Sequence, residues 1–241
     1  MLALNYFAYP HEAIKGVPDK HFDIKLEIFP GIREWMKTRP ELDQKKISLY
    51  GVSKGAEFAL LAASQYDWIA KVVAVVPSDI VWEGYSGDVV KKSSHSSWSK
   101  DGQPWPYVEL FPFIPTHEGM YRTNTERYER SRVRAGGTVQ AARIPIEKTT
   151  ARLLLLASDR DEVWASGNMT RQLVEQMVLA GKAEQVQVKI YPRAGHQLSG
   201  TGTFPVRLYG EQSNDPDAKD IIAEGEAAAE CWKKTIAFLK K

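Results

Sequence analysis

Cysteine is almost absent from this sequence, which has only Cys231 among its 241 residues. One thiol can form neither an internal disulfide bond nor a zinc site built from several cysteines. This composition is typical of a reducing compartment, and we expect a cytoplasmic location.

An excess of one charge and a long apolar run are also missing. The 32 basic and 30 acidic side chains nearly cancel, so no strong field favours nucleic acid or an anionic membrane. The apolar stretch near residue 1 is too short to span a bilayer, and it lacks the basic start and cleavage site of a signal peptide. We therefore expect neither nucleic acid nor a membrane as a partner.

Short apolar runs alternate with longer amphipathic segments along the chain, which predicts βαβ units around a mostly parallel sheet. The expected strands are residues 2–7, 47–51, 72–76, 152–157 and 186–191. The expected helices are residues 23–37, 54–65, 166–180 and 217–240. The length fits a single α/β domain covering residues 1–241.

The alternation stops between residues 77 and 144, where aromatic residues, proline, serine and charge accumulate. A long irregular insertion within a domain is usually functional, so we expect a lid or a binding segment. The alternative is a surface excursion packed by its own aromatic rings. We expect the other four histidines, two in the connector after the first strand and two in the insertion, to lie on the surface.

Ser53 is the candidate nucleophile, because it is the serine of a Gly-x-Ser-x-Gly in LYGVSKGAEFAL. The preceding residues predict a strand and the following ones a helix, which is the setting of a nucleophile elbow. Gly51 and Gly55 remove side chains where strand and helix crowd each other. The N–H of Lys54, at the start of the helix, is a candidate oxyanion donor. The alternative is an ordinary serine in a turn.

A serine nucleophile needs a base that an acid holds in place, and in this fold both follow the serine in the chain. His196, directly after the last predicted strand, is the candidate base. Asp159 and Asp161 follow the preceding strand and are both candidate acids. Asp79 is a further alternative acid, and a solvated loop acid or helix cap is the other reading of Asp161.

These segments resemble the C-terminal catalytic domain shared by acyl-CoA thioesterases and bile acid-CoA:amino acid N-acyltransferases. The resemblance covers nearly the whole chain: LALNYFAYP, GVSKGAEFAL, SSWSKDGQPWPYV, IPIEK, SDRDEVWAS, YPRAGH and CWKKTIAFLKK. It implies an α/β-hydrolase fold, here N-terminally truncated and carrying an aromatic-rich insertion.

The resemblance also implies roles for particular residues. Ser53 is the nucleophile, His196 the base, and Asp161 rather than Asp159 the acid, because the family's acid stands three positions before a tryptophan, here Trp164. Since serine replaces the cysteine of the amino acid transferases, hydrolysis of a thioester is favoured over transfer to an amine. The implied reaction needs no metal or organic cofactor.

Two parts of the family pattern are not found: an N-terminal β-sandwich domain, and a strand, glycine-rich oxyanion loop and helix before LALNYF. Three explanations are open. The sequence is part of a longer protein, or the first predicted strand pairs with the elbow strand or with a second subunit in a homodimer. The third is that the protein is a degenerate, weakly active relative of the family. Tyr6 or Tyr9 is a candidate replacement for the second oxyanion donor.

The insertion supplies the candidate substrate-binding residues Trp82, Trp98 and Trp105, with Tyr85 and Phe111 nearby. Tyr6, at the end of the first predicted strand, is a further candidate for substrate binding. Its arginines are either ligands for phosphate or the solvated face of a helix. Three other functions remain alternatives to a thioesterase: a carboxylesterase or dienelactone-type hydrolase, an amino acid N-acyltransferase, and a non-enzymatic subunit.

Overall fold

The computed structural model describes residues 2–8, 13–43, 46–85, 93–112, 124–200 and 218–241. The chain divides into two compact units. The first contains Met1–Gln44, Ile80–Arg122 and Arg127–Arg143, and the second contains Lys45–Asp79, Thr123–Glu126 and Ile144–Lys241. The single domain over residues 1–241, and the lid role of residues 77–144, stay predictions.

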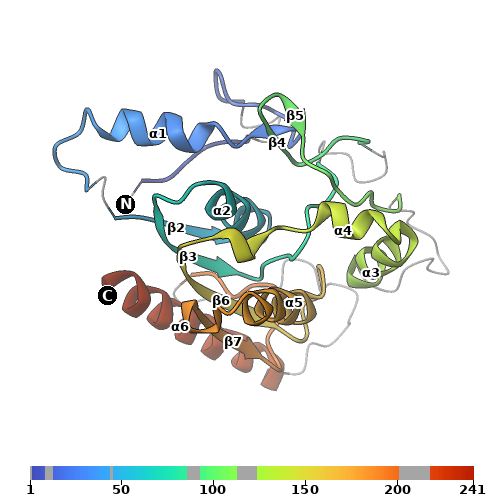
Figure 1. Cartoon of the computed structure of the whole chain (residues 1–241). Coiled ribbons are helices and arrows are strands. Elements are labelled where there is room, and N and C mark those ends of the chain that lie inside the picture. Colours follow the sequence, from blue (N-terminus) through green and yellow to red (C-terminus); the bar gives the residue numbers. More distant parts are fainter. Residues whose placement is uncertain (1, 9–12, 44–45, 86–92, 113–123, 201–217) are drawn as a thin grey trace. The chain divides into compact units, whose positions relative to one another are not determined.

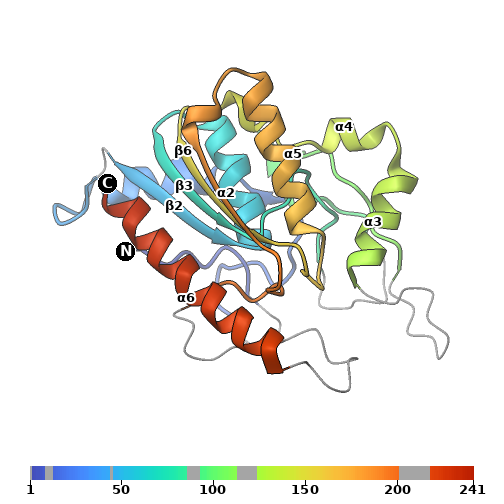
Figure 2. The same cartoon turned by 90° about the horizontal axis from the view of Figure 1, so that it is seen from below.

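The second unit is built on a sheet of four parallel strands (Figures 1 and 2). They are β2 (Ile47–Val52), β3 (Ile69–Val75), β6 (Arg152–Ser158) and β7 (Val186–Tyr191), in the order β2-β3-β6-β7. The two central strands have almost no solvent exposure from Val72 to Val75 and from Leu153 to Leu156. Burial on both faces explains why these runs are continuously apolar. The four strands predicted in this region are confirmed.

Helices cover both faces of this sheet. α2 (Lys54–Gln65) and α5 (Ser166–Leu179) lie on one face, and α6 (Ala218–Lys240) lies on the other (Figure 2). Val73 pairs with Leu154 and Val75 with Leu156, so these four side chains share a face. They form one apolar cluster with Ala227, Cys231 and Phe238 of α6. Short 3-10 turns at Ile146–Lys148 and Ala183–Gln185 precede β6 and β7.

The parallel arrangement sets where the candidate residues emerge. Carboxyl ends of parallel strands lie at one edge of a sheet, where ligands of open α/β sheets bind. Ser53 follows β2, Asp161 lies in the loop after β6, and His196 lies in the loop after β7. The fold therefore gathers these three residues at the same edge.

The first unit contains a small sheet of its own, made of β1 (Ile24–Lys25), β4 (Trp98–Lys100) and β5 (Gln103–Pro104). β1 and β4 are parallel, whereas β4 and β5 are antiparallel. α1 (Ile28–Met36), α4 (Thr138–Ala142) and most of α3 (Asn124–Ala135) also belong to this unit. Trp82 and Trp98 are fully buried in its interior.

The prediction of a strand at residues 2–7 is wrong for the described part of that segment, which has no regular structure. The segment makes aromatic contacts instead. Tyr6 packs against His21 and Trp98, Phe7 packs edge-on against His21, and the N–H of Ala8 donates to Pro18 O at 3.0 Å. His21, expected on the surface, is only 4% exposed because these rings surround it. His11 and His117 lie outside the described residues.

The helix predicted from residue 23 begins later, at Ile28. Asp23 has a positive φ of 48°, which a helix cannot accommodate, and its N–H donates to Ser96 O at 2.7 Å. Residues 24–25 then pair with β4. The apolar spacing does correspond to a helix from residue 28 onward, but residues 24–25 pair with a strand that is distant in sequence.

Among the residues that the structure describes, no helix is both long enough and apolar enough to cross a membrane.

The buried thiol on α6 generates a prediction about alkaline pH. Burial raises the pKa of Cys231 from 9.0 to about 12. The unfolded thiol ionises at lower pH than the folded one, so the free energy of unfolding falls as pH rises from 9 toward 12. Cys231→Ala should show a slope that is shallower by up to about 1.4 kcal/mol per pH unit. Urea unfolding of both proteins at about pH 8 and about pH 10.5 measures it, and equal slopes would contradict the prediction.

Candidate active site

Ser53 lies in a strained turn between β2 and α2. Its φ of 54° and ψ of −120° place it outside the regions that residues other than glycine normally occupy. Its N–H donates to Val75 O at 2.9 Å, and its carbonyl accepts the N–H groups of Ala56 and Glu57 at 2.9 and 3.1 Å. The hydroxyl makes no capping bond to the helix. The backbone is thus fixed on both sides, while the hydroxyl is not used to cap α2.

Gly51 makes this turn sterically feasible. A Cβ at position 51 would lie 2.1 Å from Gly55 O and 2.4 Å from Gly55 C. Both are backbone atoms that cannot move aside independently, and residue 51 has no positive φ that would by itself require glycine. Close approach of strand and helix is therefore the reason for glycine here.

Lys54 is the first residue of α2, and the N–H groups of a helix's first turn point out of its end. This orientation fits the proposed oxyanion donor. Its ammonium lies 2.6 Å from Oε1 of Glu57, whose side chain is fully buried. Burial lowers the pKa of Lys54, and the Glu57 carboxylate opposes that shift. The ion pair anchors the first turn of α2 next to Ser53.

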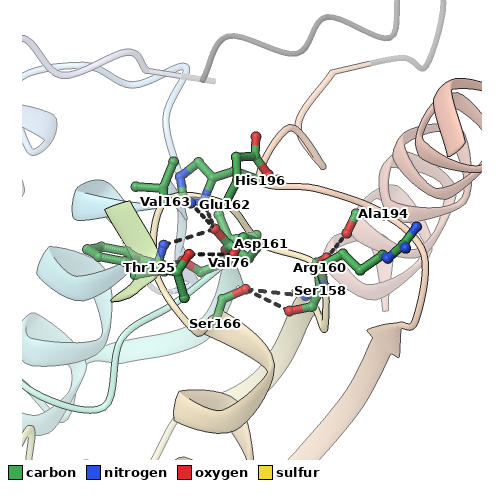
Figure 3. A network of polar contacts seen from close by, with 11 residues as sticks. Val76, Thr125, Ser158, Arg160, Asp161, Glu162, Val163, Ser166, Ala194 and His196 are labelled. Atoms are coloured by element: carbon green, nitrogen blue, oxygen red, sulfur yellow. Dashed lines mark hydrogen bonds and ion pairs between the residues drawn. The ribbon is translucent and has the colours of Figure 1, made fainter. Parts of the chain in front are cut away.

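The structure joins His196 to Asp161. Nδ1 of His196 lies 2.8 Å from Oδ1 of Asp161, and the two side chains are 5% and 1% exposed (Figure 3). The same oxygen accepts the N–H groups of Val163 and Trp164 at 2.9 and 3.1 Å. An ionised carboxylate only accepts hydrogen bonds, so the neutral imidazole tautomer that fits this contact has its proton on Nδ1 and its acceptor on Nε2.

Further contacts hold the loop that carries Asp161. Thr125 Oγ1 donates to Asp161 O at 2.7 Å (Figure 3). Trp164 Nε1 donates to Val76 O at 3.1 Å, and its ring packs edge-on against His196 with centroids 5.9 Å apart. The carboxylate and the imidazole are therefore both fixed by neighbours.

Within the described residues, neither of the other two candidate acids is bonded to His196. Asp159 forms a two-point ion pair with Arg171, at 2.8 and 3.0 Å, on the surface. Asp79 is buried, and its carbonyl accepts the N–H of Ile144. Of the three acids considered, Asp161 is the one that contacts the imidazole.

Ser53 is not hydrogen-bonded to His196 within the described part of the chain. The structure brings the imidazole and its acid into contact, and it puts the serine at the end of another strand of the same sheet. Nor does any group of three or more histidine, cysteine, aspartate or glutamate residues in the described ranges form a metal site.

The remaining candidates lie in the first unit. Tyr6, Trp82, Trp98 and Trp105 belong to it, and their role in substrate binding stays a prediction. Tyr9 lies outside the described residues. Arg127 donates to Phe111 O, and Arg134 donates to Glu109 O at 3.0 Å and stacks on Phe111. These two arginines thus hold residues 109–111 against α3.

Sequence reasoning missed two residues beside the histidine. Oε2 of Glu162 accepts the N–H of His196 at 2.9 Å, and Oγ of Ser158 donates to Ala194 O (Figure 3). No sequence signal marks either residue, because both bind main-chain groups, which do not depend on a motif.

Comparison with known protein families shows to which family the chain belongs. The family described as "BAAT / Acyl-CoA thioester hydrolase C terminal" matches residues 24–241. The chain belongs to this family. The resemblance inferred from the sequence motifs is thereby confirmed.

Curated relatives match the whole chain at low identity. Acyl-coenzyme A amino acid N-acyltransferase 2 of Mus musculus is 23% identical over 257 residues, covering 100% of this chain and 53% of the relative. Acyl-coenzyme A thioesterase 5 of Mus musculus is 24% identical over 247 residues, with the same coverage. The chain therefore spans about half the length of the curated relatives it matches.

Solved structures identify the fold as an α/β-hydrolase fold, as expected. Acylaminoacyl peptidase of Pyrococcus horikoshii superposes with a TM-score of 0.53 at 13% identity, over 89% of this chain and 27% of the peptidase. A puromycin-hydrolyzing peptidase of Mycobacterium tuberculosis gives a TM-score of 0.52 at 8% identity, over 91% of this chain and 26% of that protein.

The turn around Ser53 generates a prediction about stability. Gly51→Ala should lower the free energy of unfolding by more than about 3 kcal/mol, because the new methyl group would overlap the backbone of Gly55. Gly31→Ala is the matched control: it lies within α1 with nothing within 4 Å of a Cβ, and should be neutral or stabilising by up to about 1 kcal/mol. Urea unfolding compares the two, and similar stability of both variants would contradict the described turn.

Proposed function

We propose that this protein is a serine hydrolase that cleaves an acyl thioester, with acyl-CoA as the substrate class, through Ser53, His196 and Asp161. The observation that carries the proposal is the buried bond between His196 and Asp161 at the sheet edge where β2 ends in the strained Ser53. Strained residues of this kind cluster at active sites.

In the first half of the reaction, Ser53 Oγ attacks the thioester carbonyl while Nε2 of His196 takes the hydroxyl proton. The tetrahedral oxyanion accepts a hydrogen bond from the N–H of Lys54. When the intermediate collapses, the carbon–sulfur bond breaks and the imidazolium returns the proton to the departing thiolate. Asp161 holds the imidazole in the tautomer that leaves Nε2 basic and stabilises the imidazolium.

In the second half of the reaction, a water molecule attacks the acyl carbon of the acyl-enzyme and hydrolyses the ester on Ser53. Nε2 of His196 takes a proton from the attacking water, and the bond between the acyl carbon and Ser53 Oγ then breaks. The imidazolium returns the proton to Ser53, and a carboxylic acid is released. The Ser53–His196 contact that both halves need forms in the substrate complex, where catalytic hydrogen bonds often tighten.

Family membership and the relatives' names support a thioester as the substrate. The matched family and several relatives, such as acyl-coenzyme A thioesterase 5, have acyl-CoA thioester hydrolysis in their names.

We still expect a reducing, cytoplasmic location, because the sequence has a single cysteine and its thiol is buried and free.

Transfer of the acyl group to an amino acid is the second candidate, because a relative of similar identity is named for it. The two reactions differ only in what attacks the acyl-enzyme. Product analysis with an acyl-CoA in the presence of glycine or taurine separates them, since hydrolysis releases the free acid alone.

The nucleophile can be tested directly. A fluorophosphonate probe should label the wild-type protein on Ser53, and Ser53→Ala should abolish labelling and lower turnover of acyl-CoA by about 10⁴-fold or more. Parallel rates on acyl-CoA and on p-nitrophenyl esters distinguish a thioesterase from a carboxylesterase. A folded wild-type protein that neither labels nor turns over either substrate would favour a non-enzymatic subunit.

The choice of acid gives a second prediction with a matched control. Asp161→Asn should lower kcat by about 10⁴-fold, because an amide no longer selects the imidazole tautomer. Asp159→Asn, two residues away, should keep wild-type kcat because its carboxylate contacts Arg171 on the surface. Steady-state kinetics of both variants decide it, and equal losses would contradict the assignment of Asp161.

A further inference from the structure

We propose that Glu162 is a positioning residue that fixes the backbone of His196, while Asp161 fixes its ring, so that Nε2 is held in the orientation the reaction needs. This inference rests on the proposed function. It assigns consecutive acids to two different atoms of the same histidine.

The loop after β7 has little regular structure to hold it. Residues 192–200 form neither helix nor strand. Among the atoms of His196, the Asp161 carboxylate binds Nδ1 of the ring, which leaves the position of the main chain to other contacts. A displacement of about 1 Å at a catalytic group can cost about 10²-fold in rate, so this backbone has to be held as well.

Two side chains from the β6 end hold the main chain on either side of residue 195. Oε2 of Glu162 accepts the N–H of His196 at 2.9 Å, and Oγ of Ser158 donates to the carbonyl of Ala194 (Figure 3). Ser158 is itself buried and is also bonded to the N–H of Arg160 at 3.1 Å. The strand end and loop that carry Asp161 therefore fix residues 194 and 196 by their peptide groups.

Gly195 allows the Glu162 carboxylate to come this close. A Cβ at position 195 would lie 2.7 Å from Oε2 of Glu162 and 2.9 Å from Oε1 of Glu224. The residue has no positive φ, so its conformation alone does not require glycine. The missing side chain leaves the space that the carboxylate occupies next to the N–H of His196.

Two substitutions of Glu162 test whether its acceptor oxygen is what matters: alanine removes that oxygen, whereas glutamine keeps one and removes only the charge. Glu162→Ala should lower kcat by about 10- to 100-fold with KM within about twofold, because His196 acts in the chemical step. Glu162→Gln keeps an oxygen acceptor for the N–H and should stay within about threefold of wild type. Glu175→Ala, on the exposed face of α5, is the control expected to match wild type.

The steric argument supplies an independent variant. Gly195→Ala should displace the Glu162 carboxylate and lower kcat as Glu162→Ala does, although Asp161 and Glu162 are both still present. In the Glu162→Ala background the same change should cost less, because the contact it disturbs is already gone. Equal losses from Glu162→Ala and Glu162→Gln, or strictly additive effects in this cycle, would overturn the proposal.

Amide hydrogen exchange provides a measurement that does not depend on activity. The N–H of His196 should exchange faster in Glu162→Ala than in the wild type, and Glu162→Gln should restore slow exchange. If wild-type protein fails to label with the fluorophosphonate probe but shows this exchange pattern, the proposed function is wrong and the backbone contact stands. Unchanged exchange in Glu162→Ala would overturn the positioning role even in an active enzyme.

Discussion

Parallel pairing of β2, β3, β6 and β7 is the constraint on which the candidate active site depends. Each strand of such a sheet delivers the following loop to the same edge, so residues more than a hundred positions apart in the chain meet there. Parallel strands need cover on both faces, which the apolar runs of β3 and β6 make favourable and which α2, α5 and α6 supply. Packing against α6 through Ala227, Cys231 and Phe238 therefore stabilises the site indirectly, by stabilising the sheet.

Two neighbouring strands end in strained backbone at this edge. Ser53 follows β2 with a φ of 54°, and Val76 follows β3 with a φ of 43°, which is unfavourable for a β-branched residue. Both are held by hydrogen bonds that cross the sheet: Ser53 N–H to Val75 O, and Val76 N–H to Leu156 O. Trp164 then binds the Val76 carbonyl while its ring packs on His196. The strain is sustained by packing, as expected where a turn must present particular atoms.

The sequence predicts most of the second unit and much less of the first. Continuous apolar runs mark β3 and β6, and α2 begins and ends at the predicted residues, because burial and helix periodicity are local signals. Residues 2–7 have the same composition as a strand, yet their rings pack around His21, and β1 pairs with a segment more than seventy residues away. Such pairings depend on partners that periodicity does not reveal. Ser53 and His196 could be proposed from motif and order, and Asp161 rather than Asp159 from the family resemblance. Glu162 could not be proposed, because nothing in DEVW indicates which carboxylate faces a backbone N–H.

Gly51, near the proposed nucleophile, and Gly195, next to the proposed base, are both glycines because a neighbouring group lies too close for a side chain. Neither glycine needs a positive φ, and at each position an added Cβ would meet an atom within 3 Å. At Gly51 the excluded neighbour is the helix backbone, so the absence of a side chain sets how closely α2 approaches β2 and hence the turn at Ser53. At Gly195 the neighbours are two carboxylates, one of which binds the N–H of His196. The first contact is rigid and the second is made by flexible side chains, so a substitution at 51 has to disturb the fold, whereas one at 195 can disturb the histidine while leaving the sheet in place.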